Sequence, residues 1–201
     1  IRDDGPESHA VKSGTPTMGG LLILSTLIAS TLLWANLTNP YVWLILLATI
    51  GFGLIGFVDD YMKLKKNKGM TARVKLIFQI LLSLAIGVYL IYFDPNRSEY
   101  ATRLYIPIFK EFQPDLGVWY LLLIVFTIVG TSNAVNLTDG LDGLAIGPII
   151  VATITYTLIL YVCGHFKFAE YLRIQHIKDA GEIAVFSSAV IGASLGFLWF
   201  N

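Results

Sequence analysis

Two acidic clusters stand beside hydrophobic runs that are long enough to cross a bilayer. Asp59 and Asp60 follow one run, and Asp139 and Asp142 precede another. An aspartate at the centre of a membrane helix costs roughly 2.5–3.5 kcal/mol, and less toward the interface. We therefore expect both clusters at the membrane–water boundary, where carboxylates bind cations, position phosphates or transfer protons. This placement predicts a membrane enzyme with a polar, metal-using site on one face.

The first acidic pair is expected directly after a helix that ends near Val58. Two carboxylates at a helix C-terminus are disfavoured by the helix dipole and by each other. Lysines close behind them, or a bound metal, would offset that repulsion. Asp59 and Asp60 therefore form either a solvated acidic boundary or a site that binds Mg²⁺, positions a phosphate or accepts a proton. The lysines that follow are Lys63, Lys65, Lys66 and Lys68.

The second cluster lies in the stretch TSNAVNLTDGLDGLA, where amide and carboxylate side chains recur every three residues. A helix would place these side chains along one side. Gly140 and Gly143 instead favour a break in which the backbone approaches a ligand. Capping of the next helix explains one aspartate but not the whole set, so a functional role is the stronger interpretation. The recurring side chains are Asn133, Asn136, Asp139 and Asp142.

Basic and hydroxyl side chains near these clusters suit a phosphate-bearing substrate. Residues 5–20 form a loop rich in Gly and Thr that also holds Lys12. Such a loop contacts a phosphate, although it is equally typical of an ordinary helix entry. Lys75 either extends to the interface or reaches a phosphate beside the carboxylates. The three His and one Cys make no zinc pattern, whereas oxygen ligands favour Mg²⁺.

The composition is typical of a polytopic membrane protein. The chain is 55% hydrophobic and 14% charged, with a mean hydropathy of +0.68. These values exclude a disordered chain, and a net charge of zero gives no electrostatic footprint for nucleic acid. The chain begins without Met in a charged segment and stops after an apolar run. We interpret both ends as cuts in a longer protein.

Six apolar runs approach the ~20 residues that a helix needs to cross a bilayer. The shortest would need flanking residues or local thinning of the bilayer. They predict an all-α, polytopic fold in a single integral membrane domain, residues 1–201. The runs are about 18–35, 41–58, 74–93, 117–135, 144–163 and 183–200.

Basic residues set the orientation of these spans. Segments 1–17, 59–73 and 136–143 share one side, which with its helix margins holds eight Lys and Arg against six on the other. The short loop 36–40 on the opposite side carries none. The positive-inside rule therefore places the acidic clusters in the cytoplasm.

These motifs resemble those of the MraY family, the phospho-N-acetylmuramoyl-pentapeptide transferases, within the polyprenyl-phosphate N-acetylhexosamine-1-phosphate transferase superfamily. The resemblance covers essentially the whole chain, and the run NAVNLTDGLDGLA is highly specific. The matching stretches are GPESH and GTPTMGG within 5–20, GFVDDYMKL at 56–64, GTSNAVNLTDGLDGLAIGP at 130–148, and GEIAVF with GASLGFLWFN within 181–201.

The resemblance implies a Mg²⁺-dependent transfer of phospho-MurNAc-pentapeptide from UDP-MurNAc-pentapeptide to undecaprenyl phosphate. The products would be lipid I and UMP, in peptidoglycan biosynthesis. It also implies a multi-pass protein of the bacterial cytoplasmic (inner) membrane, with its active site on the cytoplasmic face. Members of the family often form homodimers, and no interface for one is visible in the sequence.

The resemblance also assigns roles to individual residues. Asp59 and Asp60 match the family's first acidic pair, and we carry them over as candidate metal ligands. One of that pair is held either to attack as a nucleophile or to deprotonate the lipid phosphate. Asp142 matches another acidic residue of that active site, and Lys75 matches a lysine that meets phosphate. Matches to the nucleotide pocket are Lys12, Thr17, Asn136, Asp139, Gly140, Leu141 and Asn201.

The chain departs from the family by omission. It lacks the family's first span and its C-terminal spans. It stops before a Met-Gly-Asp motif whose aspartate is a Mg²⁺ ligand, and before a histidine-rich cytoplasmic loop. We therefore expect the 201-residue piece to be inactive by itself, although the protein it belongs to is active.

Two rival functions share some of these features. A sister enzyme that transfers GlcNAc-1-phosphate to a polyprenyl phosphate would have the same acidic clusters, although the loop at 1–20 favours the muramoyl enzyme. A transporter or flippase would place its charges near mid-span, often with inverted repeats. Here the acidic clusters lie at span ends on one side, and no repeat is visible.

Overall fold

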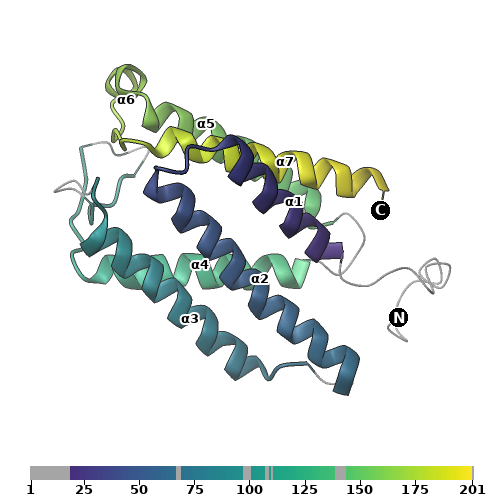
Figure 1. The fold of residues 1–201 in the computed structure, drawn as a ribbon. Coiled ribbons are helices and arrows are strands. Elements are labelled where there is room, and N and C mark those ends of the chain that lie inside the picture. Colours follow the sequence, from purple (N-terminus) through teal and green to yellow (C-terminus); the bar gives the residue numbers. More distant parts are fainter. Residues whose placement is uncertain are drawn as a thin grey trace.

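The computed structural model describes residues 19–66, 69–96, 101–106, 109, 111–138 and 144–200. Within these ranges the chain is a bundle of helices, and it contains no named strand (Figure 1). The predicted all-α class is confirmed. The long helices are α1 (Gly19–Trp34), α2 (Pro40–Lys66), α3 (Ala72–Val88), α4 (Trp119–Thr138), α5 (Ile146–Gly164) and α7 (Ile183–Phe200).

Within the part of the chain that the structure describes, five helical segments are long and apolar enough to cross a membrane. Their boundaries lie within a few residues of those of the predicted runs, except at the C-terminal end of the segment that begins at Pro40. The sixth predicted run is α1, an apolar helix of 16 residues. At ~1.5 Å per residue it is shorter than ~30 Å of hydrocarbon. The five segments are Pro40–Lys65, Ala72–Phe93, Trp119–Thr138, Ile146–Gly164 and Ala180–Trp199.

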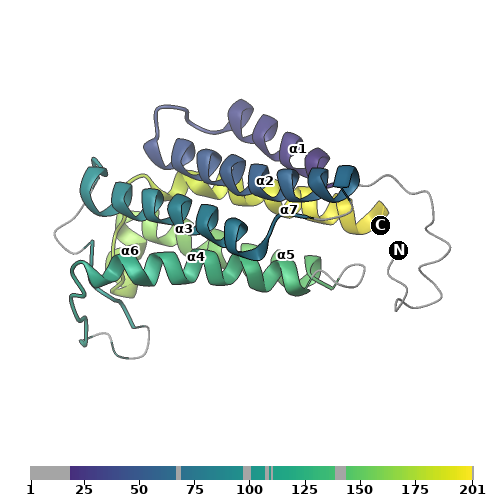
Figure 2. The same ribbon diagram turned by 90° about the horizontal axis from the view of Figure 1, so that it is seen from below.

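Successive long helices run up and down, so that the same end of the bundle receives every second connection. Helix α7 packs against α1, α2 and α5, while α3 lies between α2 and α4. Figure 2 shows the C-terminal ends of α2, α4 and α7 beside the N-terminal ends of α1, α3 and α5. We call this end, where α2 carries Asp59 and Asp60 close to its C-terminus, the acidic end.

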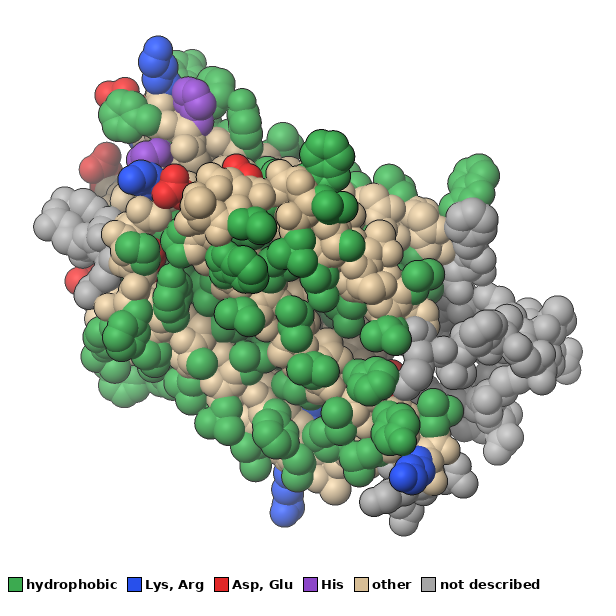
Figure 3. All heavy atoms as spheres, in the orientation of Figure 1, with side chains coloured by type: hydrophobic (Ala, Val, Ile, Leu, Met, Phe, Trp, Pro, Cys, Tyr) green, Lys and Arg blue, Asp and Glu red, His purple; other side chains and the backbone are tan. Residues whose placement is uncertain are grey.

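The surface of the bundle is apolar, as a membrane protein requires. Trp34, Phe126, Leu137 and Trp199 are each more than three-quarters exposed. Figure 3 shows hydrophobic side chains spread over the helices, whereas charged ones gather mostly toward the two ends. Side chains that would be costly to expose to water are inexpensive in lipid, where backbone polar groups must instead be satisfied within helices.

Two helices extend farther than the sequence predicts. Helix α2 continues to Lys66, so the expectation that Asp59 and Asp60 follow a helix ending near Val58 is wrong. The segment after Val58 contains no Gly or Pro before Gly69, and an aspartate–lysine pair spaced i,i+4 supports the extra turns. Helix α4 likewise continues to Thr138.

The connections at the opposite end carry little regular structure. The alternating stretch 104–109 predicts a short hairpin or an interfacial piece, and the described residues form one antiparallel bridge between Arg103 and Asp115. The Thr102 hydroxyl and the Gly117 N–H donate to Asp115 and hold the pKa of its carboxyl below the ordinary value. A short helix, α6 (Phe166–Leu172), lies in the connection between α5 and α7. It is followed by the 3₁₀ turn η3 (Ala180–Glu182).

Candidate functional site

The two neighbouring aspartates on α2 have different environments. Asp59 is 8% exposed. Its Oδ1 accepts the Met70 N–H at 2.8 Å and its Oδ2 lies 2.8 Å from Lys63 Nζ. The Asp60 side chain is 58% exposed, with its Oδ1 2.9 Å from Lys63 Nζ. Asp59 is thus held by protein donors, whereas Asp60 stands open to an incoming ligand.

Lys63 joins the two carboxylates because of its spacing on the helix. It follows Asp59 by four residues and Asp60 by three, and both separations bring side chains onto one face. Its ammonium group therefore lies between two carboxylates that would otherwise repel each other. Both carboxylates of the acidic pair therefore form an ion pair with the same ammonium group, that of Lys63.

The turn after α2 folds back onto Asp59. A Cβ atom at Gly69 would lie 2.6 Å from Asp59 Oδ1 and 2.9 Å from Lys63 Cε. Any larger residue would have to displace the carboxylate or the lysine. Gly69 therefore lets the backbone approach closely enough for the Met70 N–H to bind Asp59.

Lys75 brings α3 and α4 to the same place. It lies in the first turn of α3, where its Nζ is 4.0 Å from Asp59 Oδ2 and 3.4 Å from Asn136 Oδ1. A cation near a helix N-terminus is disfavoured by the helix dipole, and the Asp59 carboxylate compensates it. Side chains from three helices thus meet at the acidic end.

A groove of about 330 Å³ opens beside Asp60, between α1 and α2. The other residues that line it are apolar or glycine, and a Cβ at Gly20 or Gly56 would meet nothing within 4 Å. The missing side chains of these glycines make the hollow. Asp60 is therefore accessible from an apolar surface as well as from the acidic end.

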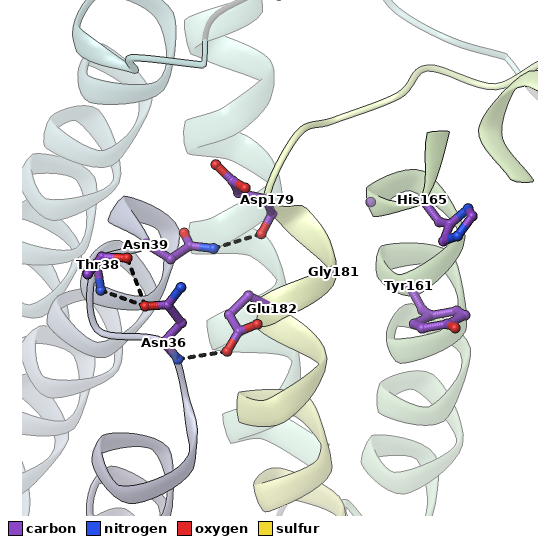
Figure 4. A pocket seen from close by; sticks show the side chains of 9 residues that line it. Asn36, Thr38, Asn39, Tyr161, His165, Asp179, Gly181 and Glu182 are labelled. Atoms are coloured by element: carbon purple, nitrogen blue, oxygen red, sulfur yellow. Dashed lines mark hydrogen bonds between the residues drawn. The ribbon is translucent and has the colours of Figure 1, made fainter. Parts of the chain in front are cut away.

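A larger cavity, of about 430 Å³, lies at the opposite end of the bundle (Figure 4). Its polar groups bond to each other across the α1–α2 connection: Glu182 Oε1 accepts the Asn36 N–H at 2.7 Å, and Asn39 Nδ2 donates to the Asp179 carbonyl at 2.8 Å. No Lys or Arg is among the described residues that line it. We interpret this cavity as a structural joint, since its polar groups bond to each other and its described lining offers no Lys or Arg for a phosphate.

Comparison with known proteins identifies the family. Residues 42–201 match the family model described as glycosyl transferase family 4, which is well over half of the chain. The chain belongs to glycosyl transferase family 4. Within this family, residues 12–24 also match signature 1 of the phospho-N-acetylmuramoyl-pentapeptide-transferases. The resemblance to the MraY family that the motifs indicate is confirmed.

Curated relatives agree with this assignment. A protein of Pelobacter propionicus is 52% identical over the whole chain, which covers 56% of that relative. A protein of Desulforapulum autotrophicum is 56% identical over the whole chain, which covers 55% of it. Both are named phospho-N-acetylmuramoyl-pentapeptide-transferase. The chain thus spans about half the length of the curated relatives that it matches.

The structure brings together four of the residues selected from the sequence of this family member. Asp59, Asp60, Lys75 and Asn136 meet at the acidic end. The other selected residues lie outside the described ranges. They are Lys12, Thr17, Asp139, Gly140, Leu141, Asp142 and Asn201.

Sequence reasoning named Lys63 among four lysines that would offset the acidic pair, but it missed two other contributors to the site. That Lys63 lies between the two carboxylates was readable from its spacing once the helix was known to continue. The Met70 N–H carries no side-chain signal, since any residue other than proline would supply it. Gln79, in the interior of α3, bonds to Asn133 of α4, and this pairing depends on the packing of two helices that are distant in sequence.

The unequal environments of the aspartates predict unequal effects on stability. Asp59→Asn removes the charge that Lys63 and Lys75 face inside the protein, and should lower the free energy of unfolding by about 1–3 kcal/mol. Asp60→Asn is the matched control, and its exposed position predicts a change within about 0.5 kcal/mol. Unfolding of both variants in detergent measures the difference. Equal midpoints for the two would contradict the described contacts.

Proposed function

We propose that the complete protein transfers phospho-MurNAc-pentapeptide from UDP-MurNAc-pentapeptide to undecaprenyl phosphate, giving lipid I and UMP. One observation carries the proposal: Asp59, Lys75 and Asn136 converge from three helices at one end of an apolar bundle. Relatives 50–56% identical over the whole chain, all named phospho-N-acetylmuramoyl-pentapeptide-transferase, support it.

Charge compensation is the main task of the described residues in such a reaction. Phosphoryl transfer needs little covalent chemistry from the protein and depends on positioning and on neutralising developing charge. Lys75 is placed to neutralise a phosphate oxygen while Asn136 orients the nucleotide. A carboxylate that attacks as a nucleophile, or that deprotonates the lipid phosphate, must be accessible to the substrates. The exposed Asp60 meets that requirement. Asp59 holds Lys63 and Lys75 in place around it.

The acidic pair fits a single divalent cation. Both carboxylates lie within 3 Å of one ammonium group, that of Lys63, so a divalent cation shared by both would take the place of that ammonium. Carboxylate oxygens are ligands that Mg²⁺ prefers. Asp60, with Asp59 behind it, would hold the ion, which when bound neutralises charge on the diphosphate. The described residues contain no group of three or more His, Cys, Asp or Glu that would hold a metal, so further ligands must come from elsewhere.

The charge distribution supports a cytoplasmic site. Lys63, Lys65, Arg73 and Lys75 lie at the same end of the bundle as the acidic pair. The positive-inside rule puts such an end in the cytoplasm, where a soluble UDP-sugar is available. We propose that the protein lies in the bacterial cytoplasmic membrane with this end inward.

UMP release tests the proposal directly. The complete protein, with Mg²⁺ and undecaprenyl phosphate in detergent, is offered UDP-MurNAc-pentapeptide and UDP-GlcNAc in parallel. We expect UMP only from the muramoyl substrate, and none from the 201-residue chain by itself. UMP only from UDP-GlcNAc would assign the protein to the sister transferases. No UMP from either, with folded protein, would refute a transferase and favour a transporter.

Asp60→Asn should abolish turnover in the complete protein. The substitution keeps the volume of the side chain and removes the charge that the reaction requires, so folding should be retained. The measurement is kcat for UMP release together with the unfolding midpoint. Glu111→Gln, an exposed carboxylate in the connection between α3 and α4, is the control. Near-normal turnover of the Asp60 variant would remove it from the site.

Lys75→Ala should lower kcat/KM for the UDP-sugar by about 10²-fold, the usual cost of one lost charge-stabilising donor. The control is Lys178→Ala, which removes an exposed lysine at the opposite end. If kcat/KM is unchanged in the Lys75 variant, the residue serves only as an interfacial anchor.

A further inference from the structure

Two amide side chains, one buried and one half-buried, join α3 to α4 deeper in the bundle than the acidic cluster. Asn133 Nδ2 donates to Gln79 Oε1 at 2.8 Å and to the Val129 carbonyl of its own helix at 2.8 Å. Gln79 Nε2 lies 3.5 Å from Ser132 Oγ. Gln79 is only 3% exposed. We call Gln79 and Asn133 the amide pair.

The amide pair is one of three contacts that run in order along the antiparallel helices. Lys75 faces Asn136 at the acidic end, and Gln79 faces Asn133 one turn deeper. Farther along, a Cβ at Gly87 would lie 2.6 Å from Leu121 Cδ1, so the two helices are close there. The three contacts belong to one alignment of the two helices, because the residue numbers rise along α3 while those of the facing residues fall along α4.

Of the two polar contacts between α3 and α4 in this series, the amide pair is the shorter and constrains the register more strongly. The two contacts of Lys75 are long, at 3.4 and 4.0 Å, and a long side chain adapts to small shifts. A buried amide that loses its partner in hydrocarbon is costly, because no water is present to replace the hydrogen bond. Sliding α3 by one helical turn, about 5.4 Å, would separate Gln79 from Asn133 and carry Lys75 away from Asp59.

We propose that Gln79 and Asn133 are positioning residues, whose mutual hydrogen bond holds α3 and α4 in the register that places Lys75 between Asp59 and Asn136. This inference rests on the proposed function of Lys75. Neither residue of the amide pair touches the acidic cluster itself, so both act through the backbone. Their loss should misplace the Lys75 ammonium, and errors of about 1 Å in positioning cost up to 10²-fold in rate.

Four variants of the complete protein show whether activity depends on the hydrogen bond between residues 79 and 133 or on the individual side chains. Gln79→Leu removes the bond, and Gln79→Asn shortens the reach by one methylene. Asn133→Gln lengthens the other side chain by one methylene, so the two amides no longer fit between the helices. The double variant Gln79→Asn with Asn133→Gln restores the total length of the pair, so it should recover kcat/KM to within a few-fold of the parent. Each single variant should lose about tenfold or more.

Ser83→Ala is the matched control, because Ser83 is a buried polar residue of the same helix as Gln79. Ser83 is fully buried on α3, and its hydroxyl donates to the Gln79 carbonyl of the same helix at 2.8 Å. Its removal takes away a buried hydrogen bond without touching the contact between helices. We expect kcat/KM of this variant to stay near that of the parent, with only the unfolding midpoint lowered.

A double-mutant cycle with Lys75→Ala shows whether the amide pair acts through Lys75. In that background Gln79→Leu should cause almost no further loss, because the group that it misplaces is gone. A direct readout is acetylation of the complete protein with N-hydroxysuccinimide acetate, followed by mass spectrometry. Lys75, whose side chain is 19% exposed, should be labelled several-fold faster in Gln79→Leu than in the parent or in Ser83→Ala.

Three results would overturn the inference. The first is an unchanged kcat/KM in both Gln79 variants. The second is a double variant of Gln79→Leu and Lys75→Ala whose loss of kcat/KM equals the product of the two single losses. The third is equal labelling of Lys75 in all folded variants. If Gln79→Leu does not fold, the Gln79→Asn variant and the length-restoring double variant decide alone. An error in the proposed function is separate, since it would appear as no UMP release from the parent, while the labelling experiment would still report on the register.

Discussion

The structure of the acidic end depends on one constraint: a carboxylate beside the hydrocarbon must have its charge compensated. Asp59 is nearly buried, and its compensation comes from three different parts of the chain. Lys63 approaches along the same helix, the Met70 N–H comes from the following turn, and Lys75 comes from α3. Because each donor is needed, the end of α2, the turn and the start of α3 have little freedom to rearrange. The exposed Asp60 is thereby held on a rigid base.

The two ends of the bundle use polar groups differently. At the acidic end, the polar groups are mostly charged side chains of α2 and α3, and Asp60 and Lys63 stay more than half exposed. At the opposite end, Asn36, Asn39 and Glu182 bond to backbone and close the connection between α1 and α2 onto the start of α7. Cavity size alone would select the second end, whereas the surplus of positive charge selects the first. A site for diphosphate chemistry needs that surplus.

The sequence predicts the helices well and their contacts poorly. Six apolar runs and the grouping of Asp59, Asp60, Lys75 and Asn136 follow from hydropathy, orientation and family motifs, since a bilayer imposes length and sidedness. The end of α2 was predicted eight residues too early, at Val58 instead of Lys66, because hydropathy falls where the helix leaves the membrane although the backbone does not change. The contacts of Asp59 with Met70 and of Gln79 with Asn133 were not predictable, because they depend on how helices pack and not on local pattern.

We propose that the acidic end, and not the larger cavity at the other end, receives the diphosphate. A structure of the complete protein with UDP-MurNAc-pentapeptide bound is the most direct test. The phosphate oxygens should then lie within hydrogen-bonding distance of Lys75, with Asp60 facing the reacting phosphate and Asn136 facing the nucleotide. A nucleotide bound among Asn39, Asp179 and Glu182, with the acidic end unchanged, would contradict it.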